Sequence, residues 1–343
     1  KKNGVRLLET EKVIPIVRDL TEWPHLVIAS FDESFLRLPR EVLISEMVEH
    51  QKYFPVEDTS GKLKAQFVIT ANIEKEEHVI RGNLKVLTSR LRDGAFLYEE
   101  DLKTSLSAMG EKLRTVTYMK ELGTISEKIE RTVIHAKALA DSLKLSSSAE
   151  ADKLCGLMKN DLVSKMVYEF PALQGVIGEY YAAHQAKVLG IDPKLAVAIR
   201  EHYMPLGAGA ALPETPAGIV LSLAEKIETL LGHFAIGNIP TGSQDPFALR
   251  RQALGVIRIL VEKKLTFSLF THLLATAKTY QKIVETFKSF PDEEKFRFAV
   301  IDFVQGRFKG YLKDLGYAPD EIETLPDPRE ANDFHDLVAR LEV

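Results

Sequence analysis

The pattern of hydrophobic and polar positions changes character near residue 112. Before that point, the short segments 27–31 and 65–72 are rich in β-branched and aromatic residues and are bounded by structure breakers, which is typical of strands. Residues 39–50 and 79–103 carry apolar side chains at helical spacing. The pattern therefore predicts an α+β domain over residues 1–112.

Beyond residue 123 the apolar positions recur with the helical period almost to the end of the chain. Thr124 or Ser126 is placed to cap a helix that runs through Leu143. Joints that contain Gly and Pro separate the further helices, which are predicted at 150–169, 175–187, 193–202, 216–232, 246–263 and 268–290. The chain is thus predicted to be predominantly helical overall, with an α+β N-terminal domain followed by a mostly α-helical one.

The stretch 239–260 leads a turn into a helix that is apolar over most of its circumference. Asp245 is a good N-cap for it. On a helical wheel Arg251 and Arg258 fall close together, with Arg250 to one side. Arginines on such a helix either pair with carboxylates of the protein or bind phosphate through their planar fork of donors. The pattern leaves both interpretations open.

A formal net charge of -4 on 343 residues means that overall charge cannot hold a polyanion, which would need a local basic patch. Arg81 and Lys85, with neighbouring arginines, form a second basic window on a predicted helix; such windows are often only solvated faces. Lys52 precedes Tyr53 and Phe54, an aromatic pair that either stacks on unpaired bases or packs within the domain.

Cys155 is the only cysteine, which excludes an internal disulfide and any site with several thiolate ligands. A reducing, cytoplasmic location is expected, because the sequence also shows neither a signal peptide nor an apolar run long enough to cross a membrane. Motifs for phosphate-cradling loops, nucleophile elbows and zinc-binding helix pairs are missing from the sequence.

Three segments carry a resemblance to a known family. They are 237–255 (GNIPTGSQDPFALRRQALG), 159–175 (KNDLVSKMVYEFPALQG, followed by GEYYA) and 50–56 (HQKYFPV). Their order and spacing resemble those of the beta subunit of bacterial heterotetrameric glycyl-tRNA synthetase, over residues 39–315 or so. Beta subunits of this family are longer than this chain, so we expect a piece of a longer polypeptide.

The resemblance implies a domain organisation. It implies a B3/4-like tRNA synthetase accessory domain at 1–112, an HD-like helical domain at 113–265, and a helical extension at 266–343 that leads to an anticodon-binding region. HD-type hydrolases bind a divalent metal through imidazole and carboxylate ligands. Here the His-Asp doublet position falls on Asn160 and Asp161, and the last carboxylate position falls on Glu225. The set looks degenerate, and we expect no metal and no metal-dependent hydrolysis.

The resemblance also implies the function. Adenylation of glycine, with ATP and Mg²⁺, belongs to the alpha subunit, whereas the beta subunit binds tRNA(Gly) within an alpha2beta2 holoenzyme. We expect this chain to bind no cofactor itself, to hold no catalytic residue and to be inactive alone. The residues expected to contact tRNA are Arg250, Arg251, Arg258, Arg81, Lys85 and Lys52.

Two alternatives stay open. In the first, the chain is an active HD-type phosphohydrolase acting on nucleotides, with Asp161, Glu225 and one or more of the histidines as metal ligands. In the second, it is an assembly scaffold without direct contact to RNA.

Overall fold

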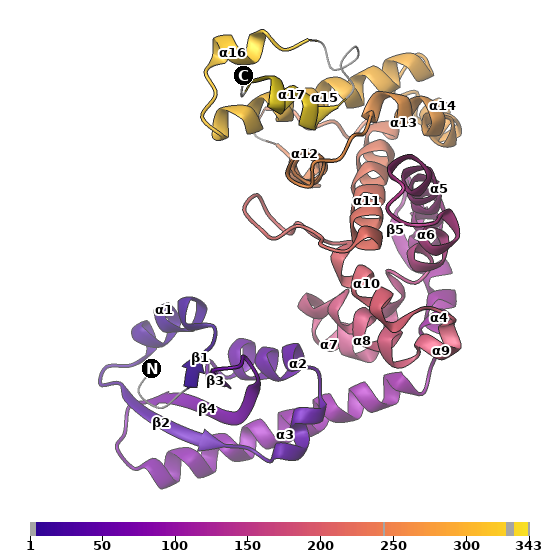
Figure 1. Ribbon diagram of the computed structural model, residues 1–343. Coiled ribbons are helices and arrows are strands. Elements are labelled where there is room, and N and C mark those ends of the chain that lie inside the picture. Colours follow the sequence, from indigo (N-terminus) through magenta and orange to yellow (C-terminus); the bar gives the residue numbers. More distant parts are fainter. Residues whose placement is uncertain (1–4, 243, 327–332, 342–343) are drawn as a thin grey trace. The chain divides into compact units, whose positions relative to one another are not determined.

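The computed structural model describes residues 5–242, 244–326 and 333–341, which form two compact units (Figure 1). The first, here called the α+β unit, contains the described residues up to Thr104 and the later segment Ser164–Ile177. The second, the helical unit, contains Ser105–Val163 and the described residues from Gly178 onward. The domain boundaries expected near residues 112 and 265 stay predictions.

The α+β unit is built on a four-stranded antiparallel sheet in the order β1-β3-β4-β2. Strands β2 and β4 confirm the two strands predicted from the sequence. Val27 of β2 lies opposite Ile69 of β4 in the register. The strands are β1 (Val5–Leu7), β2 (His25–Ser30), β3 (Phe54–Asp58) and β4 (Leu63–Ala71).

Helices cover both faces of this sheet, because successive strand residues point to opposite sides. Helix α1 (Thr10–Leu20) packs Val13 on the face that carries Val68, and α3 (Glu76–Leu102) contributes to the core around Phe67. Helix α2 (Arg40–Ser45) continues into a π-helical turn at Glu46–His50. The helices predicted at 39–50 and 79–103 are therefore confirmed.

The segment that returns to the α+β unit is fixed by a buried carboxylate. Asp101, near the end of α3, accepts hydrogen bonds from the backbone N–H groups of Lys165 (3.0 Å) and Met166 (2.9 Å). These residues begin α7 (Lys165–Glu169), and Ser164 caps it by accepting from the N–H of Val167. A negative side chain near the start of a helix also interacts favourably with the helix dipole.

The helical unit is organised around α11 (Pro216–Ala235), which is buried over nearly its whole length and packs between α5 (Ile125–Leu143) and α12 (Leu249–Glu262) (Figure 1). Thr124 caps α5 in a capping box with Glu127, as expected. The other elements are α4 (Leu106–Gly110), β5 (Thr117–Met119), β6 (Gly123–Thr124), α6 (Ser148–Cys155), α8 (Val176–His184), α9 (Ala186–Leu189), α10 (Val197–Glu201), α13 (Leu269–Thr276), α14 (Gln281–Phe287), α15 (Glu293–Asp314), α16 (Pro319–Glu323) and α17 (Phe334–Leu341). None of the helices in the described ranges is long and apolar enough to cross a bilayer.

Several predicted helices have the wrong bounds, because hydrogen bonds that the hydrophobic period does not encode determine where they end. The segments 175–187 and 193–202 are each divided into two shorter elements. The segment 150–169 is split into α6, a 3-10 turn at Asn160–Val163, and α7. The segment 268–290 is split by a 3-10 turn at Ala277–Tyr280 into α13 and α14. Helix α12 starts at Leu249, since Ala248 before it has a left-handed φ of 54°.

Candidate functional site

Buried charges lie on the central helix α11, which is otherwise almost entirely apolar. Glu225, Lys226 and Glu228 belong to it, and the Glu228 side chain is fully buried. Isolated charges in such a position would cost several kcal/mol each, so they require partners of opposite sign. The partners come from α5, from the segment after α6, and from the residues around α10.

The first group of partners surrounds Glu225. The ammonium nitrogen of Lys159 lies 3.0 Å from Glu225 Oε1 and 3.2 Å from Nε2 of His202. His202 donates from its other ring nitrogen, Nδ1, to the backbone carbonyl of Ile199, so Nε2 is left as the acceptor for Lys159. The Lys159 ammonium also lies over the ring of Tyr203, 4.5 Å from its centroid. One lysine therefore lies between a carboxylate, an imidazole and an aromatic face.

The second group surrounds Glu228 and connects α5 to α11. Lys128 donates to Glu228 Oε2 and, at 2.8 Å, to the hydroxyl of Thr229, while Arg131 Nε donates to Glu228 Oε1 at 2.9 Å. The Lys128 ammonium is also 3.4 Å from Glu225 Oε1. Both carboxylates thus share cations. We call the whole group the buried charge centre; its members are Lys128, Arg131, Lys159, His202, Glu225 and Glu228.

The pKa shifts follow from burial and from these neighbours. Burial alone would raise the pKa of Glu225, but the ammonium groups of Lys128 and Lys159 outweigh it and lower this pKa to about 2. Burial, assisted by the charge of Lys159, lowers the pKa of His202 well below its ordinary value. At neutral pH the centre therefore contains an ionised Glu225 beside a neutral imidazole.

Lys226 extends this polar region away from the ion pairs. Its ammonium donates to the backbone carbonyl of Met204 (2.7 Å) and to the hydroxyl of Ser222 (3.1 Å). Burial lowers its pKa to about 7. Its aliphatic stem lies where a Cβ on Gly255 of α12 would be, with Cε 2.7 Å from that position. A side chain at position 255 would therefore displace the end of the Lys226 side chain.

The positions expected to be remnants of a metal site have separate local roles. Asn160 donates from its amide to the carbonyl of Gly156 at 3.0 Å, and Asp161 accepts from the backbone N–H of Gly178 at 3.0 Å. Glu225 pairs with lysines. Within residues 5–242, 244–326 and 333–341, no group of three or more His, Cys, Asp or Glu side chains is arranged to hold a metal ion.

The arginines of α12 differ in their surroundings. The guanidinium of Arg250 donates to the carbonyls of Gly242 (2.6 Å) and Gln244 (3.4 Å) and so braces the turn before the helix. Arg258 pairs with Glu262 and donates to the carbonyl of Ala210 at 2.9 Å. Arg251 is exposed. The N-cap position predicted for Asp245 is wrong, because Ala248 occupies it, but the Asp245 carboxylate accepts from the N–H groups of Leu249 (2.8 Å) and Arg250 (2.9 Å) at the helix start.

The other three predicted RNA contacts belong to the α+β unit. Arg81 and Lys85 are exposed and lie four residues apart on α3, so they share one face of that helix. Lys52 has a left-handed φ of 57° and donates to the carbonyl of Glu49 at 2.6 Å. Tyr53 and Phe54 are buried in the cores that flank the sheet. The roles of the three basic residues in RNA binding stay predictions.

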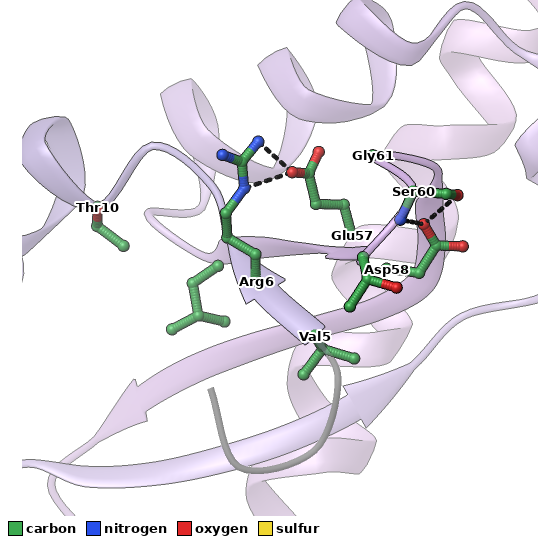
Figure 2. A pocket seen from close by; sticks show the side chains of 9 residues that line it. Val5, Arg6, Thr10, Glu57, Asp58, Ser60 and Gly61 are labelled. Carbon is green, nitrogen blue, oxygen red and sulfur yellow. Dashed lines mark hydrogen bonds and ion pairs between the residues drawn. The ribbon is translucent and has the colours of Figure 1, made fainter.

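The α+β unit also has an open pocket of about 710 Å³ beside β1 and the turn after β3. Figure 2 shows Arg6 of β1 directed at the carboxylate of Glu57 on β3, and Ser60 hydrogen-bonded to Asp58 within the turn. Arg40 donates to the other oxygen of Glu57 at 2.6 Å. The charges in and beside this pocket are therefore directed at one another.

Sequence reasoning missed the cations of the buried charge centre. Lys128 lies on the buried face of α5, next to Ile125, Ile129 and Thr132. A lysine on an apolar helix face is a signal of a buried ion pair. Lys159 directly precedes Asn160, and no local periodicity marked it as buried, because the helix predicted there is broken.

Comparisons with known proteins agree with one another. The family model for the glycyl-tRNA synthetase beta subunit matches residues 1–326. The glycine–tRNA ligase beta subunit of Delftia acidovorans is 42% identical over 342 residues, which are 99% of this chain and 47% of that protein. Its counterparts from Polaromonas naphthalenivorans and Pseudoalteromonas atlantica are 40% and 41% identical, over 94% and 97% of this chain and 44% and 46% of theirs. The chain spans about half the length of these curated relatives.

Proposed function

We propose, from the premise that this chain belongs to the glycyl-tRNA synthetase beta subunit family, that it contributes tRNA binding to a glycine–tRNA ligase whose bond-making chemistry lies on another subunit. The observation that carries the proposal is the family match, which extends over residues 1–326 and includes both compact units. The partners we propose are an alpha subunit, in an alpha2beta2 assembly, and tRNA(Gly). ATP and Mg²⁺ would be used on the alpha subunit.

The distribution of cations supports a binding role. Among the predicted contacts, Arg251, Arg81 and Lys85 are exposed side chains, so a phosphate can approach them without breaking a buried ion pair. Arg250 and Arg258 already donate hydrogen bonds to carbonyl groups of the protein, so fewer of their N–H groups are available to a phosphate. We therefore rank Arg251 first among the residues of α12.

The buried charge centre disfavours the rival function, a metal-dependent phosphohydrolase. A metal-bound nucleophile requires carboxylate and imidazole ligands that are free to coordinate the ion. Here Glu225 Oε1 and His202 Nε2 both face the ammonium of Lys159 instead. A divalent ion at that point would be repelled by the lysine and would have to displace it.

The test is reconstituted glycylation with purified alpha subunit and full-length beta subunit. We expect charging of tRNA(Gly) to require the beta subunit, and we expect the Arg251→Ala variant to raise KM for tRNA while leaving KM for glycine unchanged. A matched control is Lys187→Met, which removes an exposed charge from α9. Charging that proceeds equally well without the beta subunit would refute the proposal. Phosphate release from nucleotides by the beta subunit with Mn²⁺ would support the rival.

A further inference from the structure

The surroundings of Glu225, where the resemblance to HD-type domains would place a metal ion, contain a cation that belongs to the chain itself. The ligand types that such a metal needs are here: a carboxylate, Glu225, and an imidazole, His202, whose acceptor nitrogen faces inward. Between them lies the ammonium of Lys159, at 3.0 and 3.2 Å from the two acceptor atoms. The residues therefore do not fit a resident metal ion, because a charged group of the chain already uses both ligands.

A second ammonium completes the arrangement. Lys128 is 3.4 Å from the same oxygen of Glu225 and pairs with Glu228, and its ammonium lies 4.8 Å from the centroid of the Tyr118 ring. Each lysine is thus held by carboxylate on one side and by an aromatic face on another, the second being Tyr203 for Lys159. Three cations, Lys128, Lys159 and Arg131, thus face the two carboxylates Glu225 and Glu228.

We propose that the ammonium groups of Lys159 and Lys128 take the place of a divalent cation at this centre, so that the helical unit is held together by cations built into its own chain and needs no metal. This inference is independent of the proposed tRNA binding. The tethered cations connect α5, the segment after α6, and α11. Unlike a bound ion, they cannot be removed by a chelator.

The first experiment uses the unaltered full-length beta subunit. Its metal content is measured after purification, and its thermal unfolding is followed with EDTA, with Mn²⁺ and with Zn²⁺. We expect substoichiometric metal and a Tm that changes by less than about 1 °C among the conditions, since no bound ligand links to the folded state. A stoichiometric metal whose removal lowers Tm would overturn the proposal.

The second experiment compares Lys159→Met, which keeps the aliphatic stem but removes the charge, with the control Lys187→Met at an exposed position. We expect Lys159→Met to lose roughly 5–15 °C in Tm, because Glu225 and His202 lose their shared partner, and the control to lose almost nothing. The NMR titration of His202 should move to higher pH in Lys159→Met, since the ammonium of Lys159, which helps to lower the pKa of this imidazole, is then removed.

A third variant keeps the proposal testable if Lys159→Met fails to fold. Lys159→Met combined with Glu225→Leu removes both charges of the pair, and we expect it to recover part of the lost Tm, as paired substitutions of buried ions do. Equal stability of Lys159→Met and Lys187→Met, or a double variant that is less stable than the sum of its single changes, would overturn the role assigned to Lys159.

Discussion

The helical unit contains two groups of basic residues that share a charge but not an environment. Lys128 and Lys159 are buried against α11, and the partly buried Arg131 shares the fully buried carboxylate of Glu228 with Lys128. Arg251, on the neighbouring helix α12, is exposed. Burial and the presence of a carboxylate partner, and not the residue type, therefore decide whether a cation stabilises the fold or is available to a polyanion.

Arg258 lies between these extremes and shows why the distinction matters. On a helical wheel it shares a face with Arg251, yet its side chain is only 12% exposed and is engaged by Glu262 and by the carbonyl of Ala210. Two arginines on one helical face thus have different contacts, because the loop before α11 reaches one and not the other. Variants of the buried and the exposed charges test this contrast.

The largest effect is expected from Glu228→Gln. This change leaves Lys128 and Arg131 buried with one compensating carboxylate fewer, which costs about 3–5 kcal/mol when a buried pair is broken. The free energy of unfolding in urea measures it. The control is Glu262→Gln, which breaks a partly exposed pair with Arg258 and should cost less than about 1 kcal/mol. Similar losses for the two variants would show that burial does not set the contrast.

The next effect is a pH dependence that comes from Lys226. Its pKa is about 7 in the folded protein and near 10.5 when unfolded, so the unfolded state binds more protons between these values. Stability should therefore rise with pH from about 7 to about 10.5. Lys226→Met removes this contribution, and its unfolding free energy should rise less steeply with pH over that window than that of the unaltered protein. Parallel curves for the two proteins would contradict the burial of the amine.

A moderate effect is expected from Arg258→Ala, which removes the hydrogen bond to Ala210 and the pair with Glu262. We expect a loss of about 1–2 kcal/mol in unfolding free energy, together with a smaller change in the salt dependence of tRNA binding than Arg251→Ala produces. A stable Arg258→Ala protein with a reduced salt slope would place Arg258 among the phosphate contacts.

The smallest effect on stability is expected from the exposed cations. Arg251→Ala, Arg81→Ala and Lys85→Ala should each change the unfolding free energy by less than about 0.5 kcal/mol, since exposed positions away from caps and cores tolerate substitution. Thermal or urea unfolding of the three variants checks this. A loss above 1 kcal/mol in any of them would reveal a structural role for that side chain.

Much of the fold was predictable because its signals are local. Strands β2 and β4, helix α3 and the capped start of α5 all follow from hydrophobic period, β-branched composition and capping residues. The split of 150–169 was not predictable in this way. It depends on Asp101, distant in sequence, accepting from the backbone at the start of α7.

The candidate site was predictable only in part, for a related reason. Glu225 was singled out from the family resemblance, which also led us to expect Asn160 at the position of a metal-binding imidazole. That Lys159 and Lys128 converge on Glu225 depends on the packing of three segments around α11, which no spacing along the chain encodes. Likewise, the helical wheel grouped Arg251 with Arg258 but could not show that Arg258 donates to the carbonyl of Ala210, before α11.

The salt dependence of tRNA(Gly) binding tests the central claim most directly. In the full-length beta subunit with its alpha subunit, the triple variant Arg81→Ala, Lys85→Ala, Arg251→Ala is compared with the unaltered protein between about 50 and 200 mM salt. The account predicts a slope of log affinity against log salt that is smaller by up to about three units, with unfolding unchanged. An identical slope would contradict the claim that exposed cations of this chain hold the tRNA backbone.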